Sequence, residues 1–433
     1  MAPIAHGPAA TTPRALRRTL GLWQVSAAGI GVILGAGVYA LIGPAAAHAR
    51  QALWLAFLLA GVAAVLTAYS YARLGAMRPR TSPEFQYTAL AFGRDVGFVA
   101  GWLMLVGDIA AAASVALGFG GYLEHLTGSD VTVGALVLVA LAGIALYAGV
   151  AQSVGLAIVL TVVEAAGLVL VIVLGLPAWS RTDYAVSPDG FGGVFSAAAL
   201  IFFAYLGFDE LGNLAEEMRE PERNLPRALF IALAATALIY VAVALSATAI
   251  VPAETLGASR APLALVARGV LGESAELALG LMALAATANT VLLLLFSGSR
   301  SIYGMASDGV LPRSLARLSR TQIPIAAMLL VLGLAGVLVL SGDLSAVARL
   351  TDAVVLLSFG AVNASLVWLA LRGRTPGGAG RRLADVVVPA LGALLCLGLL
   401  VEGGWRWIAA ALAVGLIGAA YRLVARPPRG ATR

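Results

Sequence analysis

Carboxyl groups occur inside several long apolar stretches of this sequence, where a charge is costly. Asp108, Glu164, the adjacent pair Asp209 and Glu210, and Asp352 each stand among apolar neighbours. Residues in such places face protein, water or a ligand, because removal from water disfavours the charged carboxylate. They are suited to binding a proton, a cation or an amine reversibly. No nucleophile with a basic partner, metal-ligand cluster or cofactor motif accompanies them, so we expect no enzymatic chemistry, no bound metal and no cofactor.

The composition indicates whether water or lipid surrounds this chain. Of 433 residues, 61% are hydrophobic and only 12% are charged, which is too little polar surface to cover a soluble protein. The only cysteine, Cys396, excludes an intramolecular disulfide. The net charge of +6 rests on 28 basic residues, all arginine, that form no basic domain. We therefore expect a lipid bilayer, and not a nucleic acid, as the surroundings of this chain.

Apolar runs long enough to cross a bilayer number twelve, which predicts an all-α integral membrane protein. The predicted spans are 22–43, 52–77, 96–122, 131–150, 153–178, 191–215, 226–251, 275–306, 323–341, 345–371, 384–401 and 404–424. They form one transmembrane domain, residues 22–425, between an N-terminal tail 1–21 and a C-terminal tail 426–433. With both tails in the cytoplasm, 22 arginines fall in inner segments and six in outer ones, as the retention of arginine on the cytoplasmic side predicts. The expected location is the cell membrane.

Two of the spans carry helix breakers or charges at mid-depth. Span 1 has four glycines between Gly29 and Gly37. Close packing of helices explains Gly29 and Gly31 as well as an unwound segment does, whereas for residues 35–37 we favour an unwound segment. Span 6 carries Asp209 and Glu210 half-way through its length. Each span therefore has a reason to interrupt its helix in the membrane.

The spacing of these two spans predicts a binding site. Spans 1 and 6 are five apart, as the first helices of two inverted five-helix repeats are. The repeats would be residues 22–178 and 191–371, with the helices in 384–424 added. At paired breaks, the half-helix amides attract an anion and the free carbonyls attract a cation. One zwitterion satisfies both.

Four stretches of the sequence resemble the amino acid–polyamine–organocation permeases. They are the glycine-rich segment 29–37, the run 203–209 with 215–217, the run 220–226, and the run 299–312. The resemblance extends from Leu20 to about Leu371 and implies a leucine-transporter-like fold. It implies that a substrate carboxylate binds backbone amides of span 1, at Leu34, Gly35, Ala36 and Gly37. It further implies that the α-amine binds carbonyls of span 6, at Phe203, Ala204 and Leu206, with Phe208 covering the substrate.

Glu164 is the candidate for coupling transport to an ion. In some proton-coupled relatives the matching place in span 5 carries a lysine, but this chain has none. Glu164 could carry a proton, could be a structural carboxyl bonded to the backbone, Asn289 or Thr290, or could bind sodium. We expect protons, with sodium as the alternative. The predicted coupling set is Glu164, Asn289, Thr290 and Gly29.

Two further acids have less definite roles. Many relatives have an acid at the position of Gly107, one residue before Asp108, and one residue turns a helical side chain by about 100°. Asp108 is either part of the substrate site, where it would bind a second amine, or a structural acid. Asp352 is expected to line the outer vestibule or to cap a local backbone break.

Taken together, the residues predict a secondary active transporter of amino acids that works by alternating access, through proton-coupled symport. The alternatives within transport are a carrier of polyamines or other organic amines, and an amino acid exchanger. A channel or a membrane-embedded enzyme would belong to another class, and the paired broken helices favour an occluding site over either.

Overall fold

The computed structural model describes residues 20–78, 82–149, 154–185, 187, 189–307, 309–319 and 323–424. Within these residues the fold is all-helical, and the only strand-like pairing is an isolated bridge between Leu20 and Met218. Nine helical segments in this part of the chain are long and apolar enough to cross a membrane. The predicted tails 1–21 and 426–433, apart from Leu20 and Gly21, lie outside the described residues.

The described residues of the first half of the chain contain seven α-helices and two short 3₁₀ helices. They are α1 (Leu22–Ile33), α2 (Gly37–Ala49), η1 (Arg50–Ala52), α3 (Leu53–Met77), α4 (Pro83–Phe92), α5 (Arg94–Thr127), α6 (Val131–Tyr147), α7 (Val154–Gly175) and η3 (Leu176–Arg181). The first predicted span is therefore two helices, α1 and α2, with a gap of three residues between them. This gap falls at residues 34–36, close to the predicted unwound segment.

The second half contains the other interrupted span and the longest described helix, α13. Its elements are α8 (Gly190–Ile201), η4 (Phe202–Tyr205), α9 (Glu210–Asn213), η5 (Leu214–Glu217), α10 (Pro221–Ile250), α11 (Ala253–Ala258), α12 (Pro262–Leu271), α13 (Glu273–Ser307), η6 (Arg313–Ala316), α14 (Ile325–Val339), α15 (Leu344–Leu371), α16 (Ala379–Gly403) and α17 (Trp405–Val424). The predicted span 191–215 is thus α8, a 3₁₀ turn, a non-helical stretch and α9.

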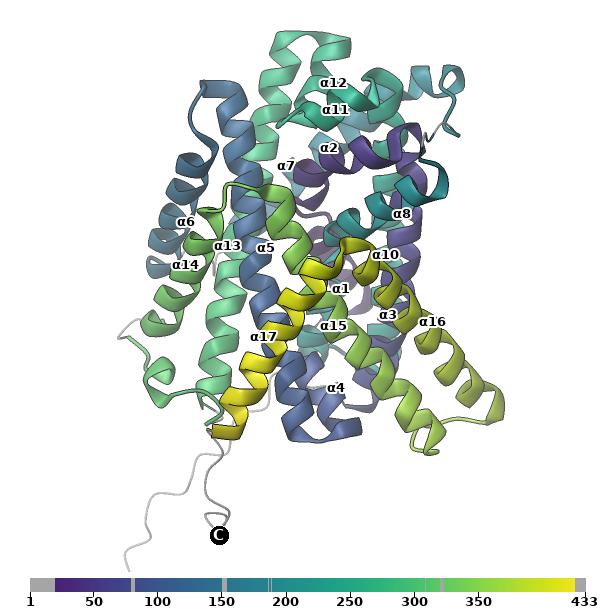
Figure 1. The fold of residues 1–433 in the computed structure, drawn as a ribbon, viewed down its shortest axis with the longest axis vertical. Helices are drawn as coiled ribbons and strands as arrows, with labels where there is room; N and C mark the ends of the chain where they lie inside the picture. The colour runs from purple at the N-terminus through teal and green to yellow at the C-terminus, as the bar shows by residue number, and fades with distance from the viewer. Residues whose placement is uncertain are drawn as a thin grey trace, which may run out of the picture.

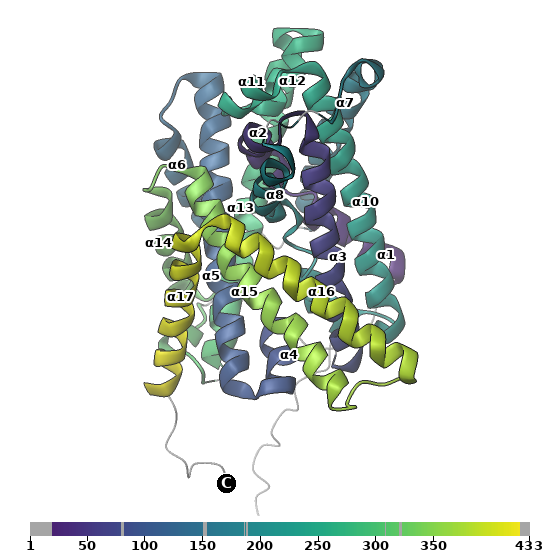
Figure 2. The ribbon, with the colours of Figure 1, turned by 45° about the vertical axis from the view of Figure 1, so that its right-hand side comes forward.

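The helices form an elongated bundle, and the two breaks lie inside it. α4 lies at one end, and α11 and α12 lie at the other (Figure 1). α1 packs against α10, and α2 packs against α8, α5 and α3, while α16 and α17 lie outside α15 and α5 (Figure 2). The side chains of α16 and α17 that face outward are apolar and exposed, as expected of a surface that contacts lipid. The residues at the two breaks, 33–36 and 202–205, are buried.

A buried ion pair joins the added helix α16 to α3. Asp385 is fully buried and accepts two hydrogen bonds of 2.7 Å from Arg73 and one of 2.8 Å from the Tyr69 hydroxyl. The guanidinium and the carboxylate thus meet in a two-pronged arrangement, which is the strongest geometry for such a pair. This contact orients α16 against α3.

We predict that Asp385→Ala destabilises the protein far more than loss of a surface ion pair does. Removing one partner leaves a charge without compensation in a buried place, which costs about 3–5 kcal/mol, against about 0–1 kcal/mol for an exposed pair. The control is Glu254→Ala, whose exposed carboxylate pairs with Arg50 at 2.7 Å. The measurement is the thermal unfolding midpoint of both variants in detergent. Equal shifts would contradict this account of α16.

Candidate functional site

The break between α1 and α2 leaves backbone groups that other helices partly satisfy. The Leu34 amide still bonds back to the Ile30 carbonyl at 2.8 Å. The Ala36 amide donates to the Thr290 hydroxyl of α13 at 3.1 Å. Within the described residues, no acceptor is bonded to the amides of Gly35 and Gly37. The break therefore presents unused amides at the start of α2, where the helix dipole attracts an anion.

The break between α8 and α9 is held open by a glycine and an aspartate. Gly207 has a φ of +107°, which a residue with a side chain rarely adopts, and a Cβ there would lie 2.8 Å from Val32 Cγ1. The Asp209 carboxylate accepts a hydrogen bond of 3.0 Å from the Gly207 amide. Leu206, the residue before Gly207, is non-helical, with a ψ of 148°. The carboxylate thus replaces a helical partner that this turn lacks.

Tyr240 of α10 connects the two breaks. Its buried hydroxyl lies 2.5 Å from the Ile33 carbonyl at the end of α1 and 3.0 Å from the Ala204 carbonyl in η4. On the other side, a Cβ on Gly37 would lie 2.7 Å from Ala204 Cα, so this contact needs glycine. The two interrupted helices therefore touch, and their free ends face one space.

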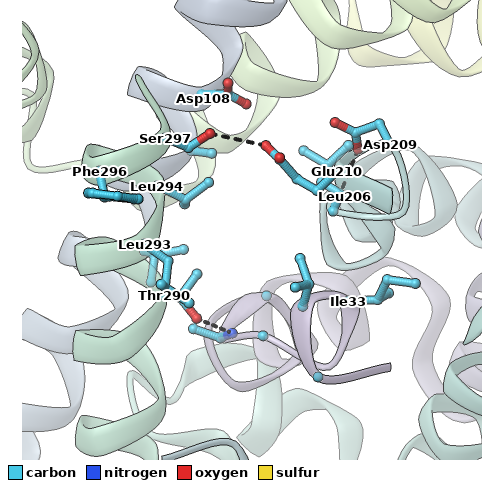
Figure 3. A pocket seen from close by; sticks show the side chains of 18 of the residues that line it. Ile33, Asp108, Leu206, Asp209, Glu210, Thr290, Leu293, Leu294, Phe296 and Ser297 are labelled. Carbon is cyan, nitrogen blue, oxygen red and sulfur yellow. Dashed lines mark hydrogen bonds between the residues drawn. The ribbon is translucent and has the colours of Figure 1, made fainter. Parts of the chain in front are cut away.

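That space is a cavity of about 560 Å³. Ten of the predicted site residues line it, namely Gly35, Ala36, Gly37, Asp108, Glu164, Phe203, Ala204, Leu206, Asn289 and Thr290. The Thr290 bond to the Ala36 amide lies at one end, and Asp108, Asp209 and Glu210 lie across the cavity from it (Figure 3). From there the lining continues through Arg300, Ser301 and Gly304 to Ser82, next to α4. Sequence positions far apart thus meet in one site.

Glu164 of α7 sits in the wall of this cavity without a hydrogen bond to its carboxyl oxygen. Its side chain is 1% exposed, and within the described residues Oε1 has no hydrogen-bond partner. Thr290, one proposed partner, instead accepts from the Ala36 amide. The backbone carbonyl of Glu164 accepts a hydrogen bond of 2.6 Å from the Tyr39 hydroxyl. Geometry therefore favours a carboxyl that exchanges a small ligand over one locked in a structural bond.

Asp108 and its neighbour Gly107 face different ways on α5. A Cβ on Gly107 would lie 2.6 Å from Val355 Cγ2, so position 107 packs against α15. Asp108 is partly exposed and lines the cavity. An acid at 107 would have no room here, whereas the acid at 108 reaches the site. Because the acid is at position 108 and not at 107, its carboxylate lines the cavity.

Three predicted residues do not line the cavity. Phe208 is fully buried, with its ring centroid 5.6 Å from that of Tyr71 and 5.2 Å from that of Phe359. The aromatic ring of this segment that does line the cavity is Phe203. Leu34 is 2% exposed and packs into the core. Gly29 is close-packed, since a Cβ there would lie 2.8 Å from the Leu211 side chain. This agrees with the alternative that Gly29 serves helix packing.

Asp352 also differs from the prediction. α15 runs without interruption from Leu344 to Leu371, so there is no break for Asp352 to cap. Its side chain is 3% exposed, and neither carboxyl oxygen has a hydrogen-bond partner within the described residues. It is therefore a buried core residue in this structure and does not line a vestibule.

Sequence reasoning missed two residues that build the site. The sequence does not indicate the role of Tyr240, because several tyrosines lie in the predicted spans. Its role depends on contact between two breaks that are far apart in the sequence. Ser297 of α13 donates a 3.2 Å hydrogen bond to Glu210 and lies seven residues after Thr290. Two helical turns separate them, so they share one face of α13. That spacing of hydroxyl residues is a signal that the sequence did contain.

Helix α4, next to one end of the cavity, carries a buried carboxyl group outside the candidate membrane spans. Glu84 is 6% exposed and accepts a 2.7 Å hydrogen bond from the Tyr71 hydroxyl. Burial raises the pKa of Glu84 from 4.5 to about 7. The hydrogen bond from Tyr71 opposes this rise only in part. Glu84 therefore changes charge near neutral pH.

Comparison with known proteins gives consistent matches along the chain. Residues 20–425 match the family described as amino acid permease. The chain is 34% identical to an uncharacterised transporter of Mycobacterium tuberculosis, over 96% of this chain and 94% of the relative. It is 26% identical to the branched-chain amino acid permease BcaP of Bacillus subtilis, over 94% and 92%. It is 31% identical to cationic amino acid transporter 4 of Homo sapiens, over 84% of this chain and 62% of the relative.

We predict that Glu84→Gln removes a pH-dependent loss of stability. Because the pKa of Glu84 is raised on folding, the folded state binds more protons than the unfolded state between pH 4.5 and about 7. Stability from this group is present at low pH and is lost as the pH rises through about 7. The glutamine variant should therefore match the parent at pH 4.5 and unfold at a higher temperature at pH 8. Glu222→Gln, at an exposed position, is the control, and equal behaviour of both variants would contradict the assignment.

Proposed function

Because the chain belongs to the amino acid permease family, we propose that it moves amino acids across a membrane by alternating access, with protons as the coupling ion. It is a multi-pass membrane protein. The observation that carries the proposal is the pair of interrupted helices that face one cavity. Half-helix ends with unused backbone groups at mid-membrane are the usual form of a carrier's binding site.

The proposed topology has twelve spans, with two inverted repeats, 22–178 and 191–371, and two added helices. The equivalent positions of the breaks, α1–α2 in one repeat and α8–α9 in the other, support it. Both termini are proposed to be cytoplasmic, since this orientation leaves 22 arginines inside and six outside. The cavity would then extend toward the cytoplasm, because α4 lies in an arginine-rich inner segment.

The substrate is proposed to bind by its two α-groups. Its carboxylate would accept hydrogen bonds from the amides of Gly35 and Gly37, and the Thr290–Ala36 hydrogen bond would hold this segment open. Its ammonium would donate to span 6 carbonyls. The Leu206 carbonyl is the best candidate, since the Phe203 carbonyl already accepts from the Leu206 amide and the Ala204 carbonyl from Tyr240. The Phe203 ring would pack against the substrate.

Proton coupling is proposed to run through Glu164. Its carboxyl is buried in the cavity wall, so the charged form is disfavoured unless a cation or donor lies nearby. Protonation from one side of the membrane and release to the other would link proton movement to the substrate cycle. The alternative is that ionised Glu164 binds sodium, with Asn289 supplying an oxygen.

The closed side of the site supports a carrier over an open pore. Beyond the breaks, toward α11 and α12, the Tyr39 hydroxyl bonds to the Glu164 carbonyl at 2.6 Å, and the Tyr122 hydroxyl bonds to the Tyr39 carbonyl at 3.1 Å. These buried contacts join α2, α5 and α7. A carrier needs such a closure to open as the other side shuts, whereas a channel would have a continuous path.

The experiment that tests this function is uptake of labelled amino acids by the purified protein in liposomes. Proton and sodium gradients are imposed separately, and the released compound is checked for chemical change. A carrier gives saturable uptake of unchanged substrate. Non-saturable flux would indicate a channel, a changed product would indicate an enzyme, and accumulation driven by sodium alone would overturn proton coupling.

We predict that Glu164→Gln loses accumulation driven by a proton gradient, by roughly tenfold or more, while counterflow exchange is retained. The amide imitates the protonated carboxyl, so the binding site remains intact but cannot release a proton. Glu124→Gln, which alters an exposed pair with Arg260, is the control. If Glu164→Gln keeps both activities, the proton role of Glu164 is wrong.

A further inference from the structure

The end of the cavity opposite the backbone amides is lined by carboxyl groups. Asp108 comes from α5, and Asp209 and Glu210 come from the start of α9. Figure 3 shows these three across the open space from the Thr290–Ala36 hydrogen bond, with Leu206, Leu293 and Leu294 between. The cavity thus has an end that attracts an anion, an apolar middle and an end that attracts a cation.

Two of the three carboxyl groups at this end have hydrogen-bond donors in the protein. Asp209 accepts from the Gly207 amide, and Glu210 accepts from Ser297. Within the described part of the chain, Asp108 has neither a hydrogen bond nor an ion pair to a basic side chain. Among the described residues that line the cavity, Arg300 is the only basic one, and its exposed guanidinium lies 4.9 Å from the centre of the Phe296 ring. The described lining therefore holds more acidic than basic side chains.

A second, independent observation points to a positively charged occupant. Glu164, on a different helix, faces the same cavity with a buried carboxyl oxygen that has no partner within the described residues. Even when Glu164 holds a proton, a neutral zwitterionic substrate would leave the charge of Asp108 uncompensated. An uncompensated carboxylate in a confined, weakly polar space is costly, and a second positive group on the substrate removes that cost.

The length of the cavity fits one kind of substrate. Thr290 marks the amide end and Ser297 the carboxylate end, and seven residues of helix separate them by about 10 Å. An occupant that contacts the amides at one end therefore needs a long side chain to contact the carboxylates at the other end.

We infer that the substrate is an amino acid with a basic side chain, whose ammonium or guanidinium binds Asp108 while its α-carboxylate binds the amides at the start of α2. This inference rests on the proposed transport function and specifies its substrate class. Asp108 is the specificity-determining residue, because it faces the cavity and has no partner of its own. Asp209 and Glu210 add to the negative potential of the same end.

The test compares arginine with citrulline, which has nearly the same shape but an uncharged side-chain end. In liposomes containing the parent protein, unlabelled arginine should compete for labelled arginine at least about tenfold better than citrulline, as loss of one charge-assisted hydrogen bond requires. Agmatine, which is arginine without the carboxylate, should also compete poorly. Leucine and isoleucine should compete more weakly than citrulline.

The matched variants are Asp108→Asn and Asp95→Asn. Both are on α5, but Asp95 is an exposed residue that pairs with Arg422 at 3.1 Å. Asp108→Asn should raise the KM for arginine about ten- to a hundredfold and narrow the arginine–citrulline difference, whereas Asp95→Asn should change neither. The competition series on the parent protein tests the inference even if Asp108→Asn does not fold.

The outcomes separate this inference from the proposed function. Saturable uptake of leucine that arginine and lysine do not inhibit would overturn the basic substrate and leave amino acid transport intact. Arginine uptake with an unaltered arginine–citrulline difference in Asp108→Asn would overturn the role of Asp108. Failure of every amino acid, basic or neutral, to be taken up would overturn the proposed function itself, and with it this inference.

Discussion

The rest of this structure depends on one constraint, the need of every backbone amide and carbonyl to find a partner away from water. Two helices of the bundle are interrupted. α1 ends at Ile33 and α2 begins at Gly37, while α8 ends at Ile201 and α9 begins at Glu210. In hydrocarbon such gaps would be costly. They persist because continuous helices surround them and because side chains from α10 and α13 take over part of the missing hydrogen bonding.

The division between satisfied and unsatisfied groups gives the site its character. Tyr240 occupies carbonyls at the back of both breaks, and Thr290 occupies one amide. The amides of Gly35 and Gly37, the Glu164 carboxyl and the Asp108 carboxylate are directed to the cavity. The fixed partners hold the gaps in place, and the remaining groups are left for what enters. Stability and binding therefore use different members of the same set of polar groups.

Much of this arrangement could be predicted from the sequence, because its signals are local or periodic. Apolar runs of sufficient length identified the helices, and the cluster ending at Gly37, together with Asp209 and Glu210, identified both breaks. Ten predicted residues line the cavity for that reason. Predictions that depended on the direction of a side chain were less secure. Phe208 and Phe203 are five residues apart, and only the turn at Gly207 decides which ring faces the cavity.

Contacts between distant segments gave no sequence signal at all. The packing of Gly29 against Leu211 and the uninterrupted helix around Asp352 follow from tertiary contacts that one sequence does not reveal. The same is true of Tyr240, whose hydroxyl bridges residues 171 positions apart, Ile33 and Ala204. In each case the sequence gives the residue type, but it does not give the residues that it contacts.

The most direct test of the central claim is an experimental structure of the protein with an amino acid bound. The account predicts that α1 and α8 remain interrupted and that the ligand's α-carboxylate lies within hydrogen-bond distance of the Gly35 and Gly37 amides. It also predicts that the ligand occupies the cavity between Thr290 and Asp108. A ligand bound elsewhere, or at this place with its carboxylate turned away from the start of α2, would contradict it.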